Sequence, residues 1–221
     1  DIHGNEIANI HAAENRRPIG INEIPKNLQN AFIAVEDNRF YDHVGIDPRG
    51  IIRAVWANIR GRTVTEGGST ITQQLAKNAY LTQDRTLKRK VQEVFLALQL
   101  ERQYTKQEIL ELYMNQIYFG QGAYGVQAAA QTYFGKDAKD LTLNECAMLA
   151  GIPKSPNYYS PINNMDAAME RKAIVLDQMV KYGYISDSEA ASTKKEPLHI
   201  AKSTNDGGRH TKSGGIRVDE K

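Results

Sequence analysis

Four short patterns, each a Ser or Thr followed three residues later by Glu or Gln, mark where helices begin in this chain. The pairs are Thr70 with Gln73, Thr105 with Glu108, Thr142 with Glu145, and Ser186 with Glu189. In such a capping box, each side chain accepts a hydrogen bond from a backbone N–H group at the start of the helix. Gly183, just before the last pair, is typical of a residue that ends a helix. The chain is therefore expected to be mainly helical.

Apolar residues spaced three and four positions apart extend this prediction. A first helix is expected from about Lys26 to Glu36, and its buried face comprises Leu28, Ala31, Phe32 and Val35. Between Arg49 and Arg62, a basic amphipathic stretch carries the only tryptophan, Trp56, and suits either a membrane interface or packing on the core. After residue 84, the longest helix has one apolar stripe of Leu87, Val91, Val94, Phe95 and Leu98.

Composition indicates an ordinary globular core. Of the 221 residues, 41% are hydrophobic and 24% are charged, which is enough to bury such a core. The formal net charge of +2 is too small to indicate nucleic-acid binding by itself. The single cysteine, Cys146, excludes an intramolecular disulfide, and its apolar neighbours place it in the core.

The chain is expected to be a piece of a longer protein, because it begins with Asp1 and has no apolar run near the roughly 20 residues that span a bilayer. Residues 1–25 are predicted to be an extended leader, and residues 26–195 one folded domain. Residues 196–221 are predicted to be a flexible linker or tail, since their later part is rich in Gly, Lys, Asp and Ser.

Positive charge gathers where the longest helix begins. The cations are Lys77, Arg85, Lys88, Arg89 and Lys90. Cations near a helix N-terminus oppose the helix dipole, so a compensating anion is expected. A diphosphate suits the position, because Lys and Arg side chains and free backbone N–H groups bind phosphate oxygens. Two other interpretations stay open: Glu93 pairs with Arg89 or Lys90, or the run is a solvated basic face.

Two carboxylates, Glu36 and Glu111, are candidates for acid–base chemistry. Glu111 lies across its helix from the apolar stripe and one turn from Asn115, so packing does not require it. Glycosyl transfer needs one carboxylate to take a proton from the attacking hydroxyl and benefits from a second at the leaving group. Alternatively, Glu111 is an ordinary surface residue and Glu36 pairs with Arg39. The polar run from Ser69 to Asn78 is richer in hydroxyls and amides than a helix cap requires, which suits a groove for sugar and phosphate.

These segments together resemble glycosyltransferase family 51, the peptidoglycan glycosyltransferases of class A penicillin-binding proteins and their monofunctional relatives. Residues 36–45, EDNRFYDHVG, resemble the first signature of that family. The second, third and fourth signatures resemble residues 68–74, 89–93 and 106–115, and the likeness extends from about Ile24 to Ala190. The fifth signature usually opens with two arginines, whereas this chain has Arg171 and Lys172. Because Lys lacks the guanidinium fork, it cannot reproduce a bidentate contact there.

The resemblance implies a mainly α fold with a lysozyme-like helical large lobe and a smaller membrane-facing jaw lobe that includes the Trp56 segment. It implies polymerisation of lipid II into glycan strands. Glu36 would deprotonate the 4-hydroxyl of the acceptor, the donor chain would be transferred with inversion, and undecaprenyl diphosphate would leave. Glu111 would assist at the diphosphate, directly or through a divalent metal such as Mg²⁺ or Mn²⁺, and no organic cofactor is expected.

The remaining site residues fall into two expected groups. Substrate or diphosphate binding is expected of Ser69, Thr70, Gln74, Lys77, Asn78, Arg85, Arg89 and Lys90. Structural support is expected of Asp37, Phe40, His43, Glu93 and Asn115. Expected partners are lipid II, the nascent glycan strand, the membrane surface and cell-wall synthesis proteins, with no nucleic acid.

The expected location is the extracytoplasmic face of the bacterial membrane, with an N-terminal transmembrane anchor that lies outside this chain. Two other functions stay open on the sequence. A muramidase or lytic transglycosylase would also use a lysozyme-like lobe and a catalytic Glu, although it would not need a diphosphate site. A non-catalytic module would bind lipid II without converting it.

Overall fold

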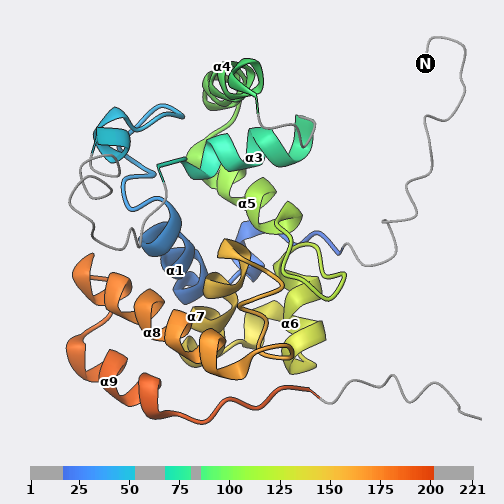
Figure 1. Cartoon of the computed structure of the whole chain (residues 1–221), viewed down its shortest axis with the longest axis vertical. Helices are drawn as coiled ribbons and strands as arrows, with labels where there is room; N and C mark the ends of the chain where they lie inside the picture. The colour runs from blue at the N-terminus through green and yellow to red at the C-terminus, as the bar shows by residue number, and fades with distance from the viewer. Residues whose placement is uncertain (1–16, 53–67, 81–85, 202–221) are drawn as a thin grey trace, which may run out of the picture.

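The computed structural model describes residues 17–52, 68–80 and 86–201, which are mainly helical (Figure 1). The α-helices are α1 (Lys26–Glu36), α3 (Ile71–Tyr80), α4 (Leu87–Gln103), α5 (Lys106–Gln116), α6 (Val126–Phe134), α7 (Leu143–Gly151), α8 (Met165–Lys181) and α9 (Asp187–Lys195). Three 3-10 helices are η2 (Ile21–Glu23), η3 (Ala138–Asp140) and η4 (Ile152–Lys154). In these ranges the β structure consists of an isolated bridge between Tyr118 and Tyr124. The mainly helical prediction is confirmed, and the division into two lobes stays a prediction.

All four capping boxes form at the starts of helices. At α3, the backbone N–H of Thr70 donates to Gln73 Oε1, and the N–H of Gln73 donates to Thr70 Oγ1, each at 3.0 Å. Both halves of the box are also present at α5, α7 and α9. At the end of α8, Gly183 has a φ of +75° and its N–H donates to Val180 O, as a helix stop requires.

The core forms around α1, which packs against both α7 and α8. Between Leu28 and Val35 all its residues except Asn30 are buried. The ring of Phe32 meets Tyr113 of α5 edge-on at 5.8 Å between centroids. A second group is formed by α3, which packs on α4 and α5. Because α5 contacts both groups, Glu36 at the end of α1 is brought near the polar helix α3.

One expected apolar stripe faces outward. In α4, the side chains of Leu87, Val91 and Phe95 are 89%, 70% and 61% exposed. The buried face of α4 instead contains Glu93, Ala97 and Leu100. Of the amphipathic stretch around Trp56, the structure describes the beginning, where Ile51 and Ile52 are exposed; Trp56 lies outside the described residues. Cys146 is buried as expected, and burial raises the pKa of its thiol to about 12.

The predicted leader and tail both contact the domain where they are described. Ile19 and Ile21 pack against the core and precede α1. At the other end, Ala201 N donates to Tyr133 O at 2.8 Å, and Asn144 Nδ2 donates to Pro197 O at 3.2 Å. The first residues after α9 therefore lie along α6 and α7. Among the helices in the described ranges, none has both the length and the hydropathy that crossing a bilayer requires.

Candidate active site

Glu36 ends α1 with its carboxylate half-buried. Gln74 of α3 donates from Nε2 to Glu36 Oε2 at 3.0 Å, and its Oε1 accepts from the hydroxyl of Tyr113 at 3.3 Å. Burial, followed by the charges of Glu36 and Asp37, raises the pKa of Tyr113 well above its usual value. Tyr113 therefore stays protonated and donates, which turns the amide nitrogen of Gln74 toward Glu36.

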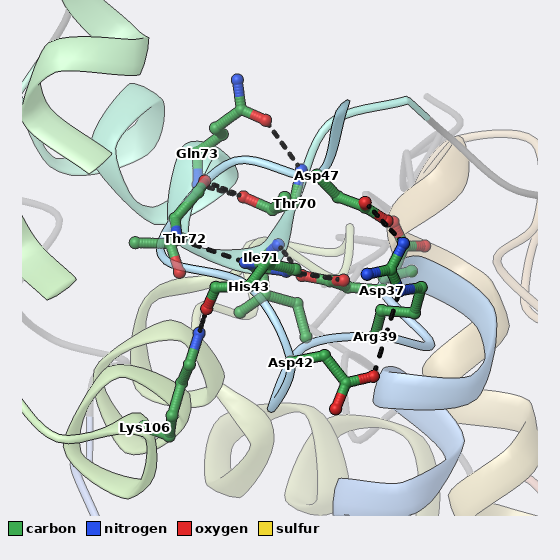
Figure 2. A network of polar contacts seen from close by, with 12 residues as sticks. Asp37, Arg39, Asp42, His43, Asp47, Thr70, Ile71, Thr72, Gln73 and Lys106 are labelled. Atoms are coloured by element: carbon green, nitrogen blue, oxygen red, sulfur yellow. Dashed lines mark hydrogen bonds and ion pairs between the residues drawn. The ribbon is translucent and has the colours of Figure 1, made fainter. Parts of the chain in front are cut away.

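The alternative in which Arg39 pairs with Glu36 is not what the structure shows. Arg39 Nη1 lies 3.1 Å from Asp47 Oδ1, and Arg39 Nε lies 3.9 Å from Asp42 Oδ2. Figure 2 shows the Arg39 side chain between Asp42 and Asp47, with an interaction to each. Within the described residues, Glu36 forms no ion pair and its Oε1 accepts no hydrogen bond, so this oxygen is free to take a proton.

Asp37 and His43 connect the end of α1 to the start of α3 (Figure 2). His43 Nε2 lies 2.9 Å from Asp37 Oδ2, and His43 Nδ1 accepts from the backbone N–H of Gly45 at 3.2 Å. Because Nδ1 accepts, the neutral ring carries its proton on Nε2 and donates it to Asp37. Asp37 Oδ2 also accepts from Ile71 N at 3.0 Å. The carboxylate next to Glu36 therefore satisfies a free N–H of the first turn of α3.

Thr70 connects the start of α3 to the turn after α1. Its side chain is buried, and its hydroxyl donates to Gly45 O at 2.7 Å while accepting from Gln73 N. Gly45 has a φ of +94°, and a Cβ there would lie 2.9 Å from Ala97 O. Only glycine suits this turn. The Thr70 hydroxyl thus donates one hydrogen bond and accepts one within the protein, and the expected role of Thr70 in substrate binding stays a prediction.

Lys106 holds the loop that follows α1. It was not among the residues that the sequence predicted for the site. Its Nζ donates to His43 O at 2.6 Å, pairs with Glu101 Oε1 at 2.8 Å and lies 4.6 Å from the centroid of the Phe40 ring. Thr72 donates to the same Glu101 oxygen at 2.6 Å. The signal was present in the sequence, because Lys106 opens the segment that resembles the fourth signature.

The cationic start of α4 contains a buried carboxylate. Glu93 is 2% exposed, and its Oε1 accepts from Lys90 Nζ while its Oε2 lies 3.6 Å from Arg89 Nη1. Lys90 Nζ also donates to Ser69 Oγ at 2.9 Å, which joins α4 to the residues before α3. The alternative in which Glu93 pairs with Arg89 and Lys90 is therefore what the structure shows. Lys77 and Asn78 are exposed on α3, and Arg85 lies outside the described residues.

Glu111 does not join the cations. Its Oε2 accepts from the backbone N–H of Ile21 at 2.7 Å, and Asn115 binds the N–H and C=O of Ile19 at 3.0 and 2.9 Å. Within the described residues, no hydrogen bond or ion pair connects Glu111 to Glu36 or to the basic side chains of α3 and α4. The carboxylate at the basic helix start is thus Glu93, and Glu111 holds the segment before α1; the expected assistance of Glu111 at the diphosphate stays a prediction.

Arg171 of α8 is a buried cation whose pKa responds to the charge of Glu36. Its side chain is 4% exposed. Burial lowers the pKa of Arg171, and the negative charge of Glu36 partly opposes this effect by raising it. Lys172, the residue that departs from the expected pair of arginines, is also buried and donates to Asn144 Oδ1 at 2.7 Å. Arg171 and Lys172 therefore lie in different environments, although they are adjacent in sequence.

The sequence of this chain matches a known protein family. A family model described as Transglycosylase matches residues 3–180, so the chain belongs to the transglycosylase family. This finding confirms the resemblance to glycosyltransferase family 51.

Relatives with high identity are penicillin-binding proteins. The chain is 52% identical over 204 residues to penicillin-binding protein 1F of Bacillus subtilis (strain 168), covering 91% of this chain and 28% of that protein. It is 48% identical over 189 residues to penicillin-binding protein 1A of Escherichia coli (strain K12), covering 86% of this chain and 22% of that protein. The chain thus spans about a quarter of the length of these relatives.

A solved structure supports the same assignment. The crystal structure of penicillin-binding protein 1A from Haemophilus influenzae is similar with a TM-score of 0.51 and 28% sequence identity. The match covers 84% of this chain and 18% of that one. The chain is therefore similar to the transglycosylase portion of class A penicillin-binding proteins.

Proposed function

We propose that this chain is a peptidoglycan glycosyltransferase that polymerises lipid II. The observation that carries the proposal is the state of Glu36: a half-buried carboxylate, oriented by Gln74, with one oxygen free among the described residues. A base needs a free oxygen within hydrogen-bond reach of the proton that it removes. Membership in the transglycosylase family supplies the reaction class.

In the proposed reaction, Glu36 takes the proton from the 4-hydroxyl of the acceptor lipid II. The resulting oxygen nucleophile attacks the anomeric carbon of the growing chain and forms the new glycosidic bond with inversion. The bond between that carbon and the diphosphate oxygen breaks, and undecaprenyl diphosphate leaves with the electron pair. Gln74 keeps the carboxylate pointed in one direction during the transfer, because the hydroxyl of Tyr113 fixes its amide.

The leaving diphosphate is proposed to bind the cations at the start of α4 and on α3. Lys90 and Arg89 are held in place by Glu93, and Lys77 is exposed on α3. Arg85 belongs to the same proposed set. Fixed cations stabilise charge that develops on a leaving group, because they need no reorganisation during the reaction. Glu93 thus has the supporting role at the diphosphate that the sequence assigned to Glu111.

The described residues do not fit a metal site made by the protein alone. They include no group of three or more His, Cys, Asp or Glu side chains arranged to hold an ion. Mg²⁺ commonly binds one or two carboxylates together with substrate phosphates, and the Glu93 carboxylate is already paired with two cations. The expected Mg²⁺ or Mn²⁺ stays a prediction, and no step of the proposed reaction uses it.

Contact with the membrane surface is supported by exposed apolar side chains. Those on α4 are Leu87, Val91 and Phe95, and those in the segment after α1 are Tyr41, Val44, Ile51 and Ile52. In Figure 1, α4 and residues 41–52 lie toward the end of the domain away from α9. Apolar and basic side chains together favour an anionic lipid surface. We propose that this end faces the extracytoplasmic surface of the bacterial membrane.

Incubation of the chain with labelled lipid II tests the proposal. The parent chain is expected to form polymer, and Glu36→Gln is expected to form none while its thermal unfolding is unchanged. Near-normal polymerisation by Glu36→Gln would remove Glu36 as the base. Release of soluble fragments from finished peptidoglycan, without polymer from lipid II, would indicate a lytic enzyme. Binding of lipid II without turnover would indicate a non-catalytic module.

A further inference from the structure

The loop that follows Glu36 depends on other elements for its position. Phe40 N donates to Asp37 O at 3.0 Å, which closes a turn inside the loop. A second turn is closed by Asp42 N and Arg39 O at 2.8 Å. Turns of this kind shape a loop but do not place it against its neighbours. Contacts with α3, α4 and α5 provide that placement, and they therefore decide where the end of α1 lies.

One side of a ring of polar contacts joins the loop to α3 directly (Figure 2). His43 Nε2 lies 2.9 Å from Asp37 Oδ2, and the same oxygen accepts from Ile71 N at 3.0 Å. Ile71 is the first residue of α3, and Gln74 follows it by one turn. Glu36 precedes Asp37 in sequence, so Glu36 and Gln74 meet across this joint.

The other side of the ring runs through a buried ion pair between α4 and α5. The Thr72 hydroxyl of α3 donates to Glu101 Oε1 at 2.6 Å, and the same oxygen lies 2.8 Å from Lys106 Nζ. Lys106 Nζ also donates to His43 O at 2.6 Å, which returns the ring to the loop. Thr72 is fully buried, and the side chains of Glu101 and Lys106 are 7% and 21% exposed. Water therefore competes little for these bonds.

Packing around the ion pair leaves the ring little freedom. A Cβ on Gly45 would lie 2.9 Å from Ala97 O and 3.1 Å from Glu101 Cγ, so the loop lies directly on α4 beside the stem of the carboxylate. Lys106 Nζ lies 4.6 Å from the centroid of the buried Phe40 ring. Lys106 thus contacts a carbonyl, a carboxylate and a ring, and these three contacts together fix where its ammonium lies.

We propose that Glu101 and Lys106 are positioning residues: they hold the loop after Glu36 and the helix that carries Gln74 in one relative position, and they act through those two residues. The inference rests on the proposed role of Glu36 as the base. Gln74 Nε2 lies 3.0 Å from Glu36 Oε2, and a displacement of about 1 Å would remove this hydrogen bond. The carboxylate would then be free to turn, and a misplacement of this size lowers a reaction rate by about 100-fold.

Steady-state polymerisation of lipid II tests the inference. Lys106→Met removes the bond to His43 O and the partner of Glu101. It is expected to lower kcat by about 10- to 100-fold with KM within about twofold of the parent, because the base is misplaced while the cations that bind the diphosphate are unchanged. Lys136→Met is the matched control: it removes the cation of another ion pair, 2.9 Å from Glu145 of α7, and should leave kcat unchanged. A folded Lys106→Met with the parent kcat would overturn the inference.

The hydroxyl of Thr72 gives a second test, which also covers the case in which Lys106→Met does not fold. Thr72→Val keeps the shape of the side chain but removes the donor to Glu101 Oε1, and kcat is expected to fall by about fivefold. Because both variants act at one oxygen, the loss in the double variant should be smaller than the product of the two single losses. Losses that multiply, or a folded Thr72→Val with the parent kcat, would show that the ring does not position the site.

The side-chain amide signal of Gln74 in ¹⁵N NMR, observed without substrate, separates this inference from the proposed function. Its chemical shift reports the hydrogen bond to Glu36 Oε2 and is expected to change in Lys106→Met but not in Lys136→Met. If the signal changes while Glu36→Gln polymerises lipid II normally, the ring holds the pair together and Glu36 is not the base. If the signal stays unchanged while Glu36→Gln abolishes polymerisation, the function stands and the inference fails.

Discussion

Glu93 and Glu111 both lie in segments that resemble family signatures, but they perform different tasks. Glu93 is buried and pairs with Lys90 and Arg89. Glu111 instead accepts a hydrogen bond from the backbone N–H of Ile21, before α1. On α5, Glu111 is about 200° around the helix from Tyr113, the residue that points toward Gln74 and Glu36. The side of the helix on which a carboxylate lies therefore decides whether it can serve the site.

Glutamine substitutions at these two positions are expected to give opposite results. Glu111→Gln should keep polymerisation of lipid II within about threefold of the parent, because the amide oxygen of Gln can still accept from Ile21 N. Glu93→Gln should lower polymerisation by about 100-fold, because Lys90 and Arg89 lose the charge that positions them. Initial rates with labelled lipid II measure both. Loss of activity in Glu111→Gln with an unchanged fold would restore the original assignment.

Much of the site could be predicted at this scale, since Glu36, Gln74, Asp37 and His43 all belong to recognisable signatures. The pairing of Glu36 with Glu111 could not be checked by sequence, because spacing along the chain does not determine which side chains meet across helices. Arg171 was noticed in the sequence only through its neighbour Lys172. Its packing against Gly151 could not be predicted, because Gly151 is 20 residues away in sequence and belongs to another helix.

Among the elements, α3 is connected to the end of α1 and the turn after it through its first turn. Thr70 caps the helix and donates to Gly45 O, while Asp37 accepts from Ile71 N. Negative charge and acceptor oxygens near a helix N-terminus are favourable for both the dipole and the free N–H groups. The sequence predicted the cap but not its second bond, because the contact with Gly45 arises from the turn after α1.

Removal of the Thr70 hydroxyl is expected to cost more stability than removal of an equivalent hydroxyl elsewhere. Thr70→Ala should lower the free energy of unfolding by about 2 kcal/mol, since it loses a cap and a buried hydrogen bond. Thr105→Ala, at the exposed box of α5, should cost about 1 kcal/mol. Urea denaturation of the two variants gives the difference. Equal losses would show that the bond to Gly45 O contributes nothing.

At the scale of the whole molecule, the apolar stripe of α4 lies on the surface instead of in the core. A stripe of this kind normally faces the core, but here the core is completed by α1, α7 and α8. The sequence predicted the helix and its stripe from periodicity alone. It could not predict which side would be covered, because that depends on the space left by the other helices.

Replacement of the exposed stripe is expected to weaken lipid binding and to leave the fold intact. Leu87→Ser, Val91→Ser and Phe95→Ser combined should reduce co-sedimentation with vesicles of anionic phospholipid by about tenfold or more. Tyr158→Ser, which changes a side chain that is 56% exposed in another part of the domain, is the control. If the triple variant binds vesicles as well as the control does, the stripe does not contact the membrane.

Cys146 provides a test of global unfolding. Because burial raises the pKa of its thiol to about 12, the reactive thiolate is scarce at pH 8 in the folded domain. Labelling by a thiol reagent should therefore be slow in the native state and should accelerate only when the core opens, with a urea midpoint equal to that seen by circular dichroism. Rapid labelling of native protein at pH 8 would mean that the α7 region opens locally.

The contacts of Glu111 and Asn115 also have a mechanical consequence. Asn115 accepts from the N–H of Ile19 and donates to its C=O, as the backbone of a neighbouring strand would. Glu111 accepts from the N–H of Ile21, two residues later. Tension applied to the chain ahead of residue 19 is thus transferred sideways into α5 before it reaches α1. Less of that force reaches α1, so Glu36 is expected to keep its position relative to α3 when the chain before residue 19 is pulled.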